Sequence, residues 1–165
     1  MIEIVKKARD FAIKKHGSQM YGENPYVYHL DKVYEVILSA GLGVDYQVAA
    51  YLHDCLEDTN TTKEELLILF NENVVNLVYS VTGEGENRKE RKQSMLNKLN
   101  DFNDGISLKM ADRLVNILES KSTNAKLYEM YKKEHNDYKD LFDLGNDYLK
   151  CALNKSITEK NKLKL

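Results

Sequence analysis

The sequence contains one proline, no tryptophan and two cysteines among its 165 residues. A single proline leaves helices almost uninterrupted, because proline lacks a backbone donor and breaks helix interiors. The two cysteines, Cys55 and Cys151, lie far apart and match no disulfide or metal-binding spacing. We therefore expect both cysteines to be reduced and to have structural roles.

Long apolar runs and an excess of positive charge are also missing. No apolar stretch approaches the roughly 20 residues that span a bilayer, and no basic segment followed by an apolar one opens the chain. The formal net charge is -2 at pH 7, which gives no polycation for a nucleic-acid backbone. These absences predict a cytoplasmic protein with neither a membrane nor a nucleic-acid partner. They say nothing of its oligomeric state.

Helical periodicity is the main pattern that the sequence does contain. Apolar residues recur with a period of 3.6, which is typical of helices that cover a core. The expected helices lie around residues 4–16, 33–40, 45–58, 61–70, 74–81, 95–99, 107–120, 127–131 and 138–153. We predict an all-α fold, with a single helical bundle over residues 1–153 and a frayed C-terminal tail over 154–165.

Several residues predict where these helices begin and end. Gly17 and Gly41 follow the first two periodic segments, as glycine often does at a helix C-terminus. Asp45 is in place to cap the third helix. Thr61 and Glu64 have the spacing of a capping box, which predicts the start of the fourth helix.

The stretch YLHDCLEDTN concentrates one imidazole and three carboxylates in six residues. On a helix with about 100° per residue, His53, Asp54, Glu57 and Asp58 lie at roughly 0°, 100°, 40° and 140°, so they share one face. Like charges at these spacings destabilise a helix by a few tenths of a kcal/mol. A divalent cation would offset that repulsion.

A metal site needs ligands from other segments, and three residues are candidates. His29 lies at a loop-to-helix junction in PYVYHLDKV, and Asp112 interrupts an apolar stripe in KMADRLVNI. Asn116 lies one turn after Asp112, on the same face. Taken alone, His29 is more often a surface or capping residue, and Asp112 is more often half of a surface pair with Arg113.

Four ordered blocks give these residues a wider context: HGSQMYGENPYVYHL, AAYLHDCLEDTNTT, LVYSVTGEGENRKERK and LKMADRLVNI. Their order resembles the signature of the HD-domain metal-dependent phosphohydrolases. More narrowly, the blocks are similar to the hydrolase domain of the RelA/SpoT proteins and to the small alarmone hydrolases. That resemblance implies an HD-domain helical bundle and an enzyme that removes the 3′-pyrophosphate from guanosine tetra- and pentaphosphate, using manganese.

The resemblance also implies roles for individual residues. It implies four metal ligands: His29, His53, Asp54 and Asp112. Glu57 and Asp58 match a catalytic pair that positions and deprotonates the attacking water, and Asn116 matches an asparagine that holds water and substrate near the metal. Members with more metals recruit further histidines, and this chain has only two to spare. His16 lies at the end of a helix, from which it could also reach the site, and His135 lies in a charged run that we expect to be solvated. We therefore expect one divalent metal ion.

The expected partner is a small phosphorylated nucleotide, which needs cations beyond the metal. Arg88, Arg91 and Lys92 are predicted to line the mouth of the site, although the same run could be a solvated helix start. Two further substrate contacts are Lys109, which can reach a phosphate, and Gln19 in the first block.

Two positions depart from the alarmone hydrolases. Tyr21 stands where that group usually has a basic residue that contacts guanine, and Leu30 stands where it usually has proline. A tyrosine can stack on any base, so the nucleotide is left open. The alternatives are an HD hydrolase of another nucleotide or nucleotide cofactor phosphate, and a nucleotide-sensing module without turnover.

Overall fold

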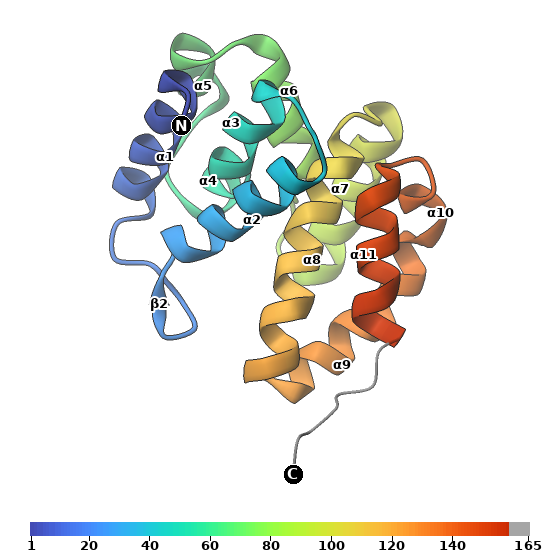
Figure 1. The fold of residues 1–165 in the computed structure, drawn as a ribbon. Helices are drawn as coiled ribbons and strands as arrows, with labels where there is room; N and C mark the ends of the chain where they lie inside the picture. The colour runs from blue at the N-terminus through green and yellow to red at the C-terminus, as the bar shows by residue number, and fades with distance from the viewer. Residues whose placement is uncertain (159–165) are drawn as a thin grey trace.

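Helices make up nearly all of the regular structure in residues 1–158, the part of the chain that the computed structural model describes (Figure 1). The elements are α1 (Glu3–His16), β1 (Met20–Tyr21), β2 (Asn24–Pro25), α2 (Val27–Ser39), α3 (Val44–Leu52), α4 (Cys55–Asp58), α5 (Lys63–Leu69), α6 (Glu72–Val81), α7 (Arg88–Asp101), α8 (Gly105–Thr123), α9 (Ala125–Glu134), the 3-10 helix η1 (His135–Tyr138), α10 (Lys139–Phe142) and α11 (Asp147–Thr158). The predicted all-α fold is confirmed.

Helix α8 forms the centre of the bundle. It packs against α2, α6, α9 and α11, and Figure 1 shows it between α2 and α11. Leu108, Ala111 and Val115 on one face are buried, and so are Met110 and Ile117 on other faces. A helix enclosed on several sides buries more than one stripe. The polar residues of α8 are therefore held in fixed positions by core packing.

Glycines end the first two helices as predicted. Gly17 follows α1 with φ 56°, and Gly41 lies just past the end of α2 with φ 70°. Both are in the left-handed region, which glycine adopts without a Cβ clash. Helix α2, however, begins at Val27 rather than near residue 33, and a two-stranded hairpin over residues 20–25 precedes it.

Both predicted N-terminal caps are wrong. Gly43 occupies the N-cap of α3, and Asp45 instead accepts hydrogen bonds from Asn71 and Asn73, at 2.9 and 2.7 Å. These bonds tie α3 to the start of α6. Because its carboxylate is already bonded to two asparagines at the start of α6, Asp45 does not cap α3.

The N-cap of α5 is Thr62, one residue later than predicted. Its Oγ1 accepts the N–H of Glu65 at 3.2 Å. Thr61 is buried and shares a hydrogen bond of 2.7 Å with Thr59. The predicted capping box of Thr61 and Glu64 is therefore replaced by a single capping hydrogen bond between Thr62 and Glu65.

The end of the described chain also differs in part from expectation. The segment that we predicted as one helix, 138–153, is divided among η1, α10 and α11. Helix α11 continues to Thr158, past residue 153, where we expected fraying to begin. Residues 159–165 of the predicted tail lie outside the described residues. None of the helices in 1–158 has both the length and the apolar character needed to cross a membrane.

Candidate active site

The junction between α3 and α4 positions His53 and Asp54. Helix α3 ends at Leu52 and α4 begins at Cys55, so the continuous helix that we predicted across this motif is wrong. Asp54 has φ −100° and ψ −3°, a local bend, although its carbonyl still accepts the N–H of Asp58 at 2.9 Å. The bend leaves the His53 side chain only 2% exposed.

Side chains from three segments meet at this junction. His53 Nε2 lies 3.2 Å from His29 Nε2 of α2 and 2.9 Å from Asp54 Oδ2. Asp112 Oδ1 of α8 lies 3.3 Å from His29 Nε2. The residues that the sequence selected as metal ligands therefore converge, although they are far apart along the chain.

The donor set fits a divalent cation. His53 Nδ1 donates to the Ala50 carbonyl at 2.8 Å, which leaves Nε2 as the nitrogen that faces the cluster. Ligand bonds of about 2.1 Å at right angles place two donor atoms roughly 3 Å apart, close to the separation of the two Nε2 atoms. Donor atoms of His29, His53 and Asp54 all lie within 4.8 Å of one another. Imidazole and carboxylate together suit manganese, iron or zinc.

The buried imidazoles and carboxylates of the cluster shift one another's pKa. Burial alone would lower the pKa of His53, but the neighbouring carboxylates of Asp54 and Asp112 outweigh that effect and raise the pKa to about 10. Burial raises the pKa of Asp112, but Lys109 and the two imidazoles hold it well below its usual range. Two carboxylates that face two imidazoles at these distances form a charge pattern that a divalent cation would balance.

Two tyrosines orient the candidate ligands. Tyr26 donates its hydroxyl hydrogen to Asp54 Oδ2 at 2.6 Å. The ring of Tyr21 stacks on His29 with centroids 4.7 Å apart, and its hydroxyl donates to Asn116 Oδ1 at 2.9 Å. Sequence reasoning missed Tyr26, although it lies in the PYVYH block. Its role depends on a contact with another segment, and no local pattern reveals that contact.

Glu57 and Asp58 flank the cluster without belonging to the close set of donor atoms. Glu57 Oε2 accepts the N–H of Gly83 at 2.8 Å, and burial raises the pKa of this carboxyl. Asp58 Oδ2 accepts from Gln19 Nε2 at 3.0 Å. Both carboxylates are thus held beside the candidate metal site, where a carboxylate can take a proton from water.

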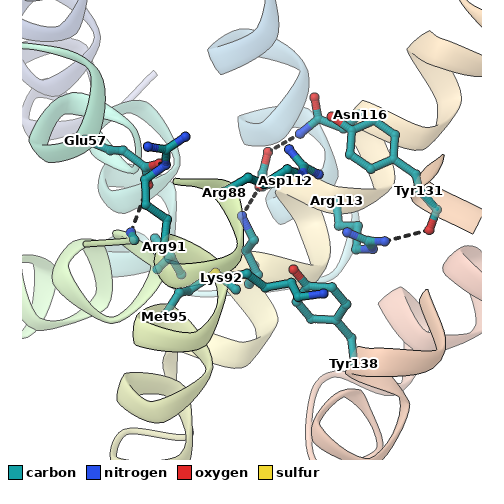
Figure 2. Close-up of a pocket in the computed structure, with 13 residues that line it drawn as sticks. Glu57, Arg88, Arg91, Lys92, Met95, Asp112, Arg113, Asn116, Tyr131 and Tyr138 are labelled. Carbon is teal, nitrogen blue, oxygen red and sulfur yellow. Dashed lines mark hydrogen bonds and ion pairs between the residues drawn. The ribbon is translucent and has the colours of Figure 1, made fainter. Parts of the chain in front are cut away.

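A cavity of about 180 Å³ opens beside Asp112 (Figure 2). Its lining includes Glu57, Asp112 and Asn116 at one end and a group of cations: Arg88, Arg91, Lys92, Lys109 and Arg113. The predicted basic run therefore lines a cavity, although Arg88 and Arg91 remain partly exposed to solvent.

Each predicted cation already has a carboxylate partner. Arg88 donates to both oxygens of Glu134, at 3.2 and 3.0 Å. Lys92 donates to Asp137 at 2.8 Å, and Lys109 to Asp112 at 2.7 Å. Arg91 has the longest of these contacts, because its Nε lies 3.5 Å from Glu57 Oε1.

Arg113 is a cavity residue that sequence reasoning placed in a surface pair with Asp112. That alternative is wrong, because Arg113 is buried and donates to the Tyr131 carbonyl at 2.6 Å. Its guanidinium lies 4.4 Å from the centroid of Tyr138, and Nε has no hydrogen-bond partner within residues 1–158. Figure 2 shows the guanidinium directed toward the Tyr131 carbonyl.

A second cavity, of about 650 Å³, adjoins the first. The two share Asn116 and Tyr131, and the second is also lined by Tyr21 and Glu119. The two spare histidines lie outside both cavities. His135, predicted to be solvated, is buried beside Phe142.

Comparison with known protein families identifies the domain that contains this site. The family described as HD domain matches residues 8–137, most of the chain. The chain belongs to the HD-domain family. All the candidate metal-binding, acidic and cationic side chains listed above lie within the matched residues of this HD domain.

Relatives of this HD domain include proteins with a named activity. A guanosine-3′,5′-bis(diphosphate) 3′-pyrophosphohydrolase of Aquifex aeolicus is 38% identical over 124 residues, which cover 70% of the chain but only 17% of that longer protein. The pyrophosphohydrolase MESH1 of Xenopus tropicalis is 34% identical over 125 residues, covering 72% of the chain and 70% of MESH1.

Solved structures share the fold. A metazoan ortholog of SpoT that hydrolyses ppGpp superposes with a TM-score of 0.83 at 24% identity, covering 94% of both chains. The lmo0812 protein of Listeria monocytogenes superposes with a TM-score of 0.64 at 23% identity, covering 80% of this chain and 95% of that one.

Proposed function

We propose that this HD domain is a metal-dependent phosphohydrolase that removes pyrophosphate from the 3′ position of a guanosine polyphosphate. The observation that carries the proposal is the shared position of Asp112, which belongs to the imidazole and carboxylate cluster and also lines the cation-rich cavity. A phosphoryl group in that cavity would lie beside the metal. The activities of MESH1 and of the Aquifex protein support the same reaction.

The proposed cofactor is one divalent ion, manganese, held by four side chains: His29, His53, Asp54 and Asp112. The imidazole nitrogens and carboxylate oxygens of the cluster support this choice. Such an ion neutralises phosphate charge and lowers the pKa of a bound water.

Three residues are proposed to prepare the water and the substrate. Glu57 and Asp58 accept the proton and orient the attacking water; the raised pKa of Glu57 supports this role, because a base works best with a pKa near the working pH. Asn116, fixed between Tyr21 and Asp112, would present its amide to water or substrate.

Five cations around one cavity favour a substrate with several phosphates. Arginine binds phosphate oxygens through two parallel hydrogen bonds, and Arg88 already makes this geometry with a carboxylate. We propose that Arg88, Arg91 and Lys92 contact the departing pyrophosphate or a second phosphorylated position, that Lys109 neutralises charge near Asp112, and that Gln19 and Tyr21 bound the nucleoside side.

A second candidate keeps the site and changes the nucleotide. Tyr21 stacks on His29 rather than presenting a positive charge, so no basic side chain of the hairpin faces the adjoining cavity. A base other than guanine, or a nucleotide cofactor phosphate, would be recognised there instead. A sensing module without turnover is the third candidate, and the presence of both Glu57 and Asp58 argues against it.

The test is a panel of nucleotides incubated with metal-stripped protein reloaded with manganese, with products separated by anion exchange. The panel contains guanosine and adenosine 3′-pyrophosphates, nucleoside mono- and triphosphates, and phosphorylated dinucleotides. We expect pyrophosphate from the guanosine 3′-pyrophosphate, lost on chelation and in Glu57→Gln but kept in Glu129→Gln, an exposed glutamate of α9. Phosphate from another member would favour the second candidate, and no turnover with metal bound would favour the third.

A further inference from the structure

Two side chains, His16 and Gln19, connect the buried thiol of Cys55 to the exposed carboxylate of Asp58. Cys55 Sγ lies 3.8 Å from His16 Nε2, and His16 Nδ1 lies 2.7 Å from Gln19 Oε1. Gln19 Nε2 donates to Asp58 Oδ2 at 3.0 Å. Neither Cys55 nor His16 belongs to the candidate metal cluster or lines either cavity at the site.

The Asp58 carboxylate, at one end of this series of hydrogen bonds, determines which atom is the donor in each bond. An ionised carboxylate accepts only, so Gln19 must turn its NH₂ group toward Asp58 and its carbonyl oxygen toward His16. The carbonyl oxygen also accepts only, so His16 Nδ1 must carry the hydrogen. In the neutral ring Nε2 is then bare and can accept from the Cys55 thiol.

His16 is held in place by more than this chain. Its ring stacks on Tyr26 with centroids 4.3 Å apart and an interplanar angle of 20°. Tyr26 in turn donates to Asp54 at 2.6 Å. The stacked rings therefore join two arms, one that ends on the candidate ligand Asp54 and one that ends on Asp58.

Asp58 needs such support, because its own helix is short. Helix α4 spans only Cys55–Asp58, and Asp58 is its last residue. Gln19 lies in the segment between α1 and the hairpin, where His16 is the last residue of α1. The Gln19 hydrogen bond therefore ties Asp58, the last residue of the short α4, to the segment that follows the packed helix α1.

We propose that His16 is a positioning residue: as the Nδ1–H tautomer it fixes the amide of Gln19, and through it sets the orientation of Asp58 relative to Asp54. The role of Asp58 in water activation rests on the proposed function above. The hydrogen-bond chain itself does not rest on it, so the two can be tested separately.

The first experiment reads the tautomer directly. Long-range ¹H–¹⁵N spectra of the imidazoles of the metal-stripped wild-type protein should show His16 with a protonated Nδ1 and an unprotonated Nε2. The Gln19→Leu variant removes the acceptor and should change the Nδ1 shift. A His16 ring protonated at Nε2 would overturn the proposal, whether or not the protein turns over any substrate.

The second experiment reads the effect on catalysis, with the substrate found active in the panel. His16→Phe keeps a ring to stack on Tyr26 but removes the donor, and Gln19→Glu keeps the shape but places a carboxylate against Asp58. We expect kcat to fall about 10- to 100-fold in both, with manganese affinity within about twofold of wild type in both and KM within about twofold in His16→Phe, whose ring lines neither cavity. Gln93→Glu, which adds the same charge at an exposed site on α7, should match wild type.

The outcomes separate the two hypotheses. An active wild type whose kcat is unchanged in Gln19→Glu and His16→Phe overturns the positioning role. A loss of manganese affinity parallel to the loss of kcat also overturns it, because the chain would then support the metal and not Asp58. If His16→Phe does not fold, Gln19→Glu decides, since Gln19 lies outside the core. An inactive wild type rejects the proposed function, and the tautomer then decides on the chain alone.

Discussion

Removal of the Tyr26 hydroxyl should weaken metal binding without dismantling the fold. Its hydrogen bond to Asp54 is 2.6 Å long, in the range of charge-assisted O–H···O⁻ bonds. Burial and the nearby Asp54 carboxylate both raise the pKa of Tyr26, so the hydroxyl remains a donor over the whole range in which the protein is studied. Tyr26→Phe removes this donor and keeps the ring that stacks on His16.

The size of the effect follows from two independent magnitudes. Hydrogen bonds to charged groups contribute about 1.5–3 kcal/mol. Loss of an outer partner of a metal ligand typically lowers metal affinity about 10- to 100-fold, which equals about 1.4–2.7 kcal/mol. We expect a loss in this range for manganese, measured by calorimetric titration of the metal-stripped protein at one pH.

The control is Tyr51→Phe, which removes the same kind of bond away from the site. Tyr51 is buried and donates to Asp31 at 3.0 Å. Both variants should lose similar stability in urea, but only Tyr26→Phe should lose manganese affinity. If Tyr26→Phe binds manganese as tightly as wild type, Asp54 is not a ligand that Tyr26 orients, and the reasoning fails.

Three further substitutions have defined outcomes. Because burial raises the pKa of Glu57 above its ordinary value of 4.5, ionised Glu57 lowers the stability of the fold at neutral pH, so Glu57→Gln should raise the urea midpoint at pH 7 by an amount that shrinks as the pH falls through the raised pKa toward 4.5 and is gone below 4.5. Glu134→Gln should lower the Kd of the metal-stripped protein for inorganic pyrophosphate about two- to fivefold, since an ion pair is worth up to about 1 kcal/mol; Glu129→Gln, on the same helix, should leave it unchanged. Gly105→Ala should cost about 1–3 kcal/mol in urea unfolding, because the new Cβ would overlap the Ser80 side chain.

Opposite results would be informative in each case. A gain in Glu57→Gln that is equal at every pH would show that the carboxyl is not perturbed in the folded state. Weaker pyrophosphate binding in Glu134→Gln would mean that this carboxylate organises the cations rather than competing for them. Wild-type stability in Gly105→Ala would show that α8 can move away from α6.

The sequence predicted the helical fold because a 3.6-residue apolar period identifies the buried face of a helix. The set His29, His53, Asp54 and Asp112 came from the resemblance of four ordered blocks to the HD-domain phosphohydrolases, since the residues alone left other roles open for His29 and Asp112. The structure brings these side chains together at 2.9–3.7 Å.

Features that depend on contacts between distant segments were out of reach. Asp45 is as good a cap in sequence as Gly43, but its carboxylate binds two asparagines at the start of α6 instead. Arg113 follows Asp112 directly, so it was interpreted as its partner, whereas α8 turns them to different faces and Arg113 meets Tyr131 and Tyr138. Competing local choices of nearly equal free energy are resolved by the tertiary fold.

The carboxylate that already holds Arg88 makes ligand binding an exchange reaction. An incoming anion gains the guanidinium of Arg88 only by releasing Glu134 to water, and the same applies to Lys92 and Asp137. A singly charged anion offers these cations no more than the carboxylates do, so its exchange is close to neutral. A diphosphate has more charge and more acceptor oxygens than a carboxylate, so the internal ion pairs set a threshold that small monoanions do not cross.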